Sequence, residues 1–211
     1  ITLCLLQMNV EERTEVSVML NISDFPWAEC APSENKVKIV SDSLSLRRTS
    51  RDTGVARWEF EFATVDMTMA EGRRRKAQLS AADVLLYTHP RLSFTQGTEP
   101  TSGIQSSSGN ARGSKTITLT SAESWQLMVG DIMQFSNDTK IYECAEDTLL
   151  QSGSQQVKLT NALRNPITDG TNVTVNDVTW YLLSDGMVDA APMHADDNET
   201  MELTLVAVEK L

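Results

Sequence analysis

The chain has 211 residues, 40% of them hydrophobic and 6% aromatic, and a formal net charge of -11. This length allows one large domain or two small ones, and the aliphatic residues are numerous enough for a packed core. No stretch approaches the roughly 18 consecutive apolar residues of a membrane-spanning helix, so membrane insertion is not expected.

The charge is unevenly distributed. Residues 1–97 carry 12 basic and 13 acidic side chains, whereas residues 98–211 carry 6 and 16. An acidic second half repels nucleic-acid phosphates, so specific nucleic-acid binding is not expected. The basic residues of the first half form two clusters, Arg47, Arg48, Arg51 and Arg57, and then Arg73, Arg74, Arg75 and Lys76. A molecule with basic and acidic regions can dock onto copies of itself head to tail.

The first half contains strand-like segments. The apolar residues 1–6 and residues 37–46 are both predicted as strands. In residues 57–62 apolar and charged side chains alternate strictly, which predicts a half-buried antiparallel strand. On this strand Trp58, Phe60 and Phe62 face one side, and Arg57, Glu59 and Glu61 face the other.

A helix is predicted over residues 69–86. Thr68 and Glu71 have the spacing of a capping box, and apolar residues then recur at helical intervals. Gly72 is a weak point, and Pro90 ends the segment because proline biases its predecessor away from helix. We expect the aromatic face of the preceding strand to be buried beneath this helix, and a short strand over residues 91–95.

Residues 96–113 are rich in glycine and serine, which predicts a linker or long loop and a domain boundary. Short strands are then predicted over residues 115–120, 131–135, 140–144, 156–160, 173–175 and 179–183. Their spacing, within about 85 residues, is typical of a small barrel such as the oligonucleotide/oligosaccharide-binding (OB) fold. Residues 200–208 alternate again and predict a last strand that returns to the first domain.

The predicted fold class is therefore mainly β (α+β). Residues 1–97 together with 183–211 are expected to form a β-sandwich-like domain with one packed helix. Residues 98–182 are expected to form an OB-like β-barrel inserted into it.

No segment has the pattern of a catalytic, metal or cofactor site. Cys4, Cys30 and Cys144 are odd in number and widely spaced, which predicts free or buried thiols. His89 and His194 lack the sequence context of a catalytic triad. The acidic residues 185–199 are predicted as a solvated loop, with a calcium site as the alternative. No enzyme activity, cofactor or metal is expected.

The aromatic residues Trp125, Trp180 and Tyr181 leave two alternatives open. They could form a stacking platform for sugars on the barrel, or they could fill its core, since a barrel of this size needs bulky residues inside.

Two parts of the chain resemble the distal tail proteins of long-tailed bacteriophages (siphophages). Residues 55–62, Met67, residues 70–72 and residues 79–82 look like the first domain of these proteins. Residues 127–135 and 140–142 are similar to their barrel portion, and in layout the resemblance covers residues 37–211. It implies a ring around the tail axis, usually of six copies in that family, in which the first domain forms the ring and the barrel projects outward. The family contributes no catalytic residues.

The resemblance implies a virion protein, made in the cytoplasm of a host bacterium, that contacts the tail tube protein and the tail hub or tip proteins. The alternative is a carbohydrate-binding module that contacts the host surface through its barrel. Candidates for the contact between copies are Arg47, Arg48, Arg51, Arg57, Arg73, Arg74, Glu59, Glu61 and the acidic residues 185–199.

Overall fold

The computed structural model describes residues 18–42, 48–184, 189–195 and 198–210. Within them, only the backbone is described for residues 35–42, 48–55, 189–195 and 198–199. The predicted first strand of residues 1–6 lies outside this part of the chain. Strands account for 50% of the residues and helix for 8%, in two sheets of which one is a curled half-barrel, which confirms a mainly β fold.

The first sheet holds residues from both ends of the described chain. Its members are β1 (Met19–Asn21), β2 (Trp27–Asp42), β3 (Arg48–Thr64), β4 (Met67–Thr68), β5 (Val84–Tyr87), β12 (Trp180–Ser184), β13 (Asp189–Ala195) and β14 (Asn198–Glu209). The strand order is β1-β5-β12-β14-β3-β2, and β13 and β4 both pair with β14. The last strand thus lies in the middle of this sheet, between strands that precede and follow the second sheet in sequence.

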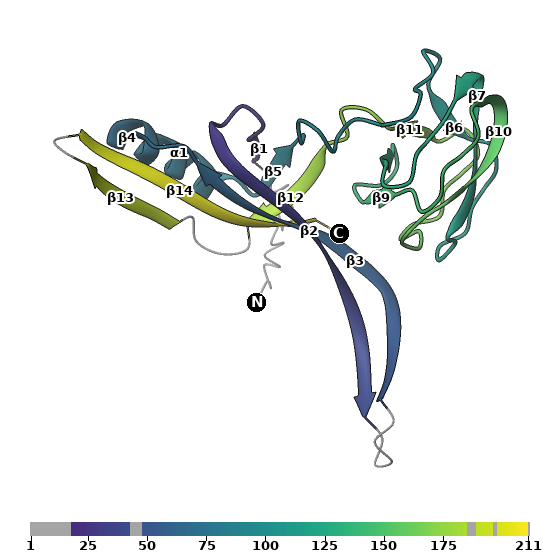
Figure 1. The fold of residues 1–211 in the computed structure, drawn as a ribbon, viewed down its shortest axis with the longest axis horizontal. Coiled ribbons are helices and arrows are strands. Elements are labelled where there is room, and N and C mark those ends of the chain that lie inside the picture. Colours follow the sequence, from purple (N-terminus) through teal and green to yellow (C-terminus); the bar gives the residue numbers. More distant parts are fainter. Residues whose placement is uncertain (1–17, 43–47, 185–188, 196–197, 211) are drawn as a thin grey trace, which may run out of the picture.

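The second sheet is formed by residues that lie between β5 and β12 in the sequence (Figure 1). Its members are β6 (Ile104–Ser106), β7 (Thr116–Trp125), β8 (Ile132–Phe135), β9 (Ile141–Glu143), β10 (Gln151–Lys158) and β11 (Asn172–Thr174), in the order β10-β7-β6-β11-β8-β9. The ends of the two edge strands meet, since Ala145 N donates to Lys158 O at 2.8 Å and Thr160 N to Glu143 O at 2.9 Å. The sheet therefore rolls around its own core.

Two details differ from the expected division of the chain. The segment predicted as a linker contains β6, whose Ile104 is 2% exposed in the core of the second sheet. Ile104 and Ser106 are both buried, and β6 pairs with β7 on one edge and β11 on the other, so a segment rich in glycine and serine still joins the sheet. Residues 180–182, placed in the barrel by the predicted boundary, pair instead with β5 and β14 of the first sheet.

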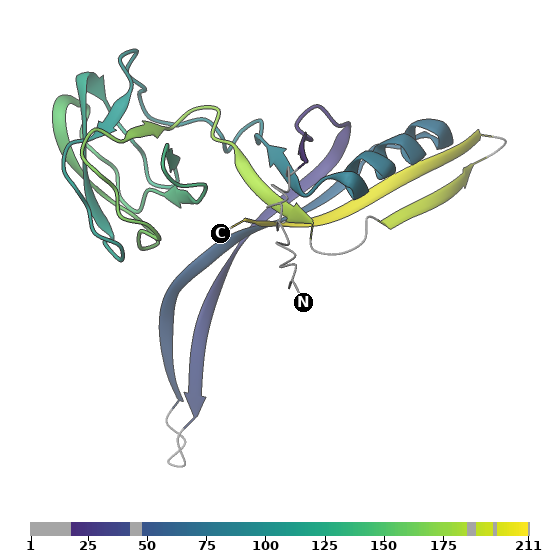
Figure 2. The ribbon, with the colours of Figure 1, turned by 180° about the vertical axis from the view of Figure 1, so that it is seen from behind.

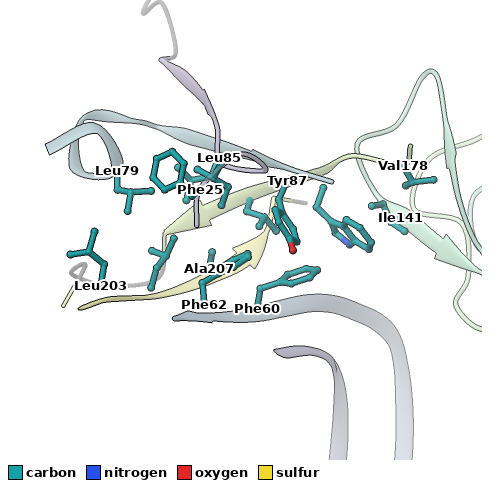
Figure 3. Close-up of a cluster of buried hydrophobic side chains, with 14 of the residues drawn as sticks. Phe25, Phe60, Phe62, Leu79, Leu85, Tyr87, Ile141, Val178, Leu203 and Ala207 are labelled. Atoms are coloured by element: carbon teal, nitrogen blue, oxygen red, sulfur yellow. The ribbon is translucent and has the colours of Figure 1, made fainter. Parts of the chain in front are cut away.

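The first sheet curls, so that aromatic rings from its two halves pack edge to face. Phe60 and Phe62 of β3 lie opposite Tyr87 of β5 (Figure 3), with 4.9 Å between the ring centroids of Phe62 and Tyr87. Trp180 of β12 lies 5.2 Å from Phe60. Phe60 and Phe62 are buried as predicted, whereas Trp58 is only partly buried. The aromatic face of β3 is therefore covered by the rings of β5 and β12 of the same curled sheet. The sequence predicted that the helix would cover this face.

The helix α1 (Met69–Ala81) begins as predicted, because Thr68 Oγ1 accepts a hydrogen bond from Glu71 N at 3.3 Å. It ends five residues before the predicted boundary at residue 86. Residues 84–87 form β5, which pairs with β1 on one edge and β12 on the other, and these sheet hydrogen bonds outweigh the helical periodicity. Gly72 is buried against β14, where an added Cβ would lie 2.5 Å from Met201 Sδ.

Two further segments differ from their predictions. Residues 91–95, predicted as a strand, form a turn in which His89 Nδ1 accepts hydrogen bonds from Arg91 N and Leu92 N. Part of the predicted acidic loop is the strand β13, whose backbone pairs with β14 along its whole length.

The outer halves of β2 and β3 leave the sheet as a two-stranded ribbon (Figures 1 and 2). Their pairing continues from Lys38 opposite Asp52 to Asp42 opposite Arg48. In the described part of the chain no third strand pairs with this ribbon, so its backbone edges stay open.

Candidate inter-subunit surfaces

The exposed side of α1 is basic. Arg73, Arg74 and Lys76 are exposed, as expected for a charged helix face. Arg75 turns the other way: its guanidinium carbon lies 4.5 Å from the centroid of the Phe25 ring. A cation placed over an aromatic face is attracted by the ring's electrons, so Arg75 serves packing more than the surface. The surface formed by Arg73, Arg74 and Lys76 is called the basic helix face below.

The outer side of the first sheet is acidic. On β3 the strand alternation predicted from the sequence places Glu61 in an exposed position and Glu59 in a half-buried one. Glu29 of β2 lies beside them and is exposed. A shallow groove of about 190 Å³ runs over this side, and Glu29, Ala31, Glu61 and Val206 are among its lining residues. This surface is called the acidic sheet face.

The two surfaces lie on opposite sides of the first domain. On β14, Met201, Leu203 and Leu205 are buried toward the side that α1 covers, and Gly72 of the helix contacts Met201. Thr204 and Val206 alternate with these residues, are exposed, and therefore belong to the other side, where the groove lies. A contact between these two unlike surfaces would be head to tail.

The other predicted contact residues are not gathered at the helix. Arg57 is half-buried on the same side of β3 as Glu59 and Glu61, so it does not belong to the basic helix face. Arg48 and Arg51 lie on the ribbon, where only the backbone is described. Arg47 lies outside the described residues, as do the side chains of residues 185–199, which include His194.

The barrel aromatics do not form a stacking platform. Trp125 and Trp180 are both 0% exposed, so of the two alternatives left open by the sequence, sugar stacking is wrong for these residues and core packing is correct. Trp180 also belongs to the first sheet rather than the second. Tyr181 is partly exposed and lines a polar cavity of about 360 Å³ together with Gln134, Asn137 and Thr139.

A buried ion pair joins the two sheets, and sequence analysis missed it. Glu209 at the end of β14 is 2% exposed. Its Oε1 accepts from Ile141 N at 2.8 Å, and its Oε2 accepts from Trp58 N at 3.1 Å. Lys140 Nζ lies 3.8 Å from Glu209 Oε2 and donates to the carbonyl oxygen of Ala56. Burial raises the pKa of Glu209, while the charge of Lys140 and the two amide donors act against this rise. The sequence contained one signal for this buried carboxylate, because Glu209 directly follows the apolar residues of the last strand.

An aromatic pocket in the first domain was also missed. It has a volume of about 490 Å³. Its lining includes Phe25, Trp27, Cys30, Tyr87, His89 and Arg91. Burial and the nearby charge of Arg91 lower the pKa of His89, and burial raises the pKa of Cys30. No carboxylate side chain is among the described residues that line this pocket. Its residues come from the β1–β2 turn and the start of β2, and from the end of β5 and the turn that follows it. Sequence periodicity does not bring these segments together.

Within the described residues, no three His, Cys, Asp or Glu side chains converge as metal ligands would. None of the described helical residues form a helix with the length and apolar character needed to cross a membrane. No protein-family model matches the sequence, and a comparison with curated proteins finds no match.

Proposed function

We propose that the protein is a structural component of a bacteriophage tail. It forms a head-to-tail ring at the distal end of the tail. The resemblance to distal tail proteins implies six copies in this ring. There it connects the tail tube protein to the tail hub or tip proteins. In this role it is a virion protein without catalytic activity or cofactor.

The observation that carries the proposal is the placement of the basic helix face and the acidic sheet face on opposite sides of one domain. A repeated contact between two unlike surfaces closes into a ring when its rotation divides a full turn, and otherwise makes a filament. The similarity of residues 55–62 and 127–135 to distal tail proteins favours the ring.

Charge in this contact sets orientation more than strength. Exposed ion pairs contribute roughly 0–1 kcal/mol each, so Arg73 and Arg74 cannot hold a ring by themselves. The acidic sheet face also offers apolar area, since Val206 is 39% exposed beside the groove. Burial of such area holds copies together, and the charges exclude the wrong orientation.

The test is the arrangement of copies in the assembled particle. Tails that contain the wild-type chain are imaged by electron microscopy beside tails that contain the Arg73→Glu/Arg74→Glu variant. The matched control is Arg112→Glu/Lys115→Glu, which makes the same charge change at two exposed positions of the second domain.

We expect the helix variant to lose rings, the control to keep them, and the added change Glu61→Arg to restore part of the loss. Two-fold, self-matched contacts between copies, or single copies around the axis, would overturn the ring. A ring in which Arg73 and Arg74 face solvent would be consistent with the proposed role in the tail. It would contradict the proposed contact between the basic helix face and the acidic sheet face.

A second candidate function is binding of a host surface polysaccharide through the second domain. Tyr181 favours it, because this partly exposed ring lines a cavity with the polar side chains of Asn137 and Thr139. The burial of Trp125 and Trp180 counts against it. Binding to a saccharide array that Tyr181→Ala abolishes would favour this function over the ring.

A further inference from the structure

The second domain exposes three large apolar side chains on two adjacent loops. Leu149 is 70% exposed, Leu150 is 59% exposed and Val129 is 56% exposed. The loops are joined because Val129 N donates to Asp147 Oδ1 at 2.7 Å and Thr148 N donates to Leu127 O at 2.9 Å. The group of Val129, Leu149 and Leu150 is called the leucine knob.

Buried polar side chains fix the backbone of the knob. Thr148 Oγ1 accepts from Leu127 N at 2.8 Å, and Gln155 Oε1 accepts from Leu149 N at 3.1 Å. Thr148 and Gln155 are each 7% exposed. A loop held from below in this way keeps its apolar side chains in water, and such exposed apolar groups mark interaction sites.

The knob has an acidic border. Glu146 and Asp147 are exposed and are separated from Leu149 only by the buried Thr148. Glu146 Oε1 lies 2.6 Å from Lys158 Nζ, in an ion pair with both side chains more than half exposed. A partner for this surface needs an apolar recess with a positive charge at its edge and without carboxylates.

The aromatic pocket of the first domain has these properties. Phe25, Trp27 and Tyr87 form the apolar part of its lining, and polar side chains such as Ser23 and Thr88 form the rest. Arg91 supplies an exposed cation. Its volume of about 490 Å³ falls in the range of roughly 300–1,000 Å³ in which proteins accept ligand groups. Within the described residues of one chain, the knob side chains are exposed and the pocket is open to its surroundings.

We propose that the leucine knob of one copy inserts into the aromatic pocket of the next copy. The two surfaces are unlike, so the contact is head to tail, as a closed ring requires. Apolar burial supplies the attraction, and the pairing of Glu146 or Asp147 with Arg91 sets the direction. The inference rests on the proposed function only in that copies must assemble.

Cys30 in the pocket provides a direct test. Leu149→Cys is introduced with Cys4→Ser, and assembled tails are oxidised with diamide. Cys144 is 1% exposed and cannot compete for the new thiol. A disulfide needs the two Cα atoms within roughly 4.4–6.8 Å, so the cross-link forms only if the knob enters the pocket.

We expect dimers and a ladder of higher species on a non-reducing gel. These species vanish when Cys30→Ser is added, and they do not form with Val65→Cys, a matched exposed apolar position of the first domain. A second variant, Ala28→Glu, places a carboxylate at the exposed edge of the pocket and should lower ring yield about tenfold with an unchanged melting temperature.

The outcomes separate this inference from the proposed function. Rings without the Leu149→Cys cross-link overturn the knob-and-pocket contact and leave the ring role standing. Absence of rings in the wild type overturns the proposed function. A cross-link within one chain overturns the inference, and so does a Cys4–Cys30 disulfide in the unmodified chain, which would place residues 1–17 in the pocket.

Discussion

Lys140 Nζ lies 3.8 Å from Glu209 Oε2, and both side chains are almost fully buried between a strand of one sheet and a strand of the other. The pair is the polar centre of the junction. Around it, Thr139 Oγ1 donates to Lys210 O at 3.4 Å and Asn161 donates to Glu34. The junction therefore fixes the two sheets relative to each other through specific groups as well as apolar contact.

Lys140→Met should destabilise the protein by about 3–5 kcal/mol at neutral pH, because it leaves the carboxylate of Glu209 buried without its cation. Urea unfolding followed by circular dichroism measures the change. Lys158→Met is the control, since the Lys158–Glu146 pair is more than half exposed and should change the free energy of unfolding by no more than about 1 kcal/mol. Equal losses in both variants would contradict the assignment.

The cost of Lys140→Met should shrink as the pH falls. Burial already raises the pKa of Glu209 from its ordinary value of 4.5, and loss of Lys140 raises it further. A carboxyl whose pKa is higher in the folded state contributes stability below its unfolded pKa, and this contribution is lost as the pH rises through the folded pKa. Unfolding curves of the wild type and variant from pH 4 to 8 check this sign. A cost that grows toward low pH would refute it.

Phe60→Ala should cost roughly 3–5 kcal/mol, the usual range for a buried aromatic residue. Phe60 is 0% exposed and packs on Phe62, Tyr87 and Trp180. Phe94→Ala is the matched control, because Phe94 is 44% exposed. Denaturant unfolding measures both variants, and an unchanged midpoint for Phe60→Ala would rule out the assigned core.

Gly72→Ala should destabilise the protein, although alanine is favoured over glycine in a helix by about 1 kcal/mol. The added Cβ would lie 2.5 Å from Met201 Sδ and 2.9 Å from Met201 Cγ, so the thioether must move. In a Met201→Ala background the same change should become neutral or stabilising. A double-mutant cycle by thermal unfolding measures this coupling, and additive effects would show that helix and strand are not in close contact.

Cys144 should resist alkylation in the folded protein. Burial raises its pKa from 9.0 to about 11, so the thiolate fraction at pH 8 is about 100-fold lower than that of a free thiol. Mass spectrometry of the Cys4→Ser/Cys30→Ser variant after iodoacetamide treatment should find Cys144 unmodified in buffer and modified in urea. Rapid modification of Cys144 in buffer would contradict its burial in the core of the second sheet.

The sequence predicts those parts of the fold whose secondary structure is determined by one local pattern of residues. Strict alternation identified the strand with Phe60, and Thr68 with its partner three residues later identified the start of the helix. The short strands after residue 113 also overlap their predicted positions, although β7 ends five residues after its predicted end and β10 begins five residues before its predicted start. The same pattern predicted Glu61 on the outer side of its strand.

Other parts depend on partners that are distant in the sequence. The helix ends at Ala81 because the following residues gain two strand neighbours, β1 and β12. The ion pair of Lys140 and Glu209, and the pocket between Trp27 and Tyr87, each join segments more than 50 residues apart. No periodicity within either segment contains that information.

The second domain leaves and rejoins the first sheet at neighbouring points, since Thr88 Oγ1 and Thr179 Oγ1 lie 3.1 Å apart. The 90 residues between these threonines therefore form an insertion whose two ends lie side by side at the first sheet. A tight turn could replace them without moving β5 or β12, and a different domain could be grafted there as easily. The two domains can therefore diverge except where they meet, at the ion pair of Lys140 and Glu209 and at Ile141, which packs in the core of the first sheet. In the proposed assembly, the leucine knob and the aromatic pocket add a second constraint that the domains share.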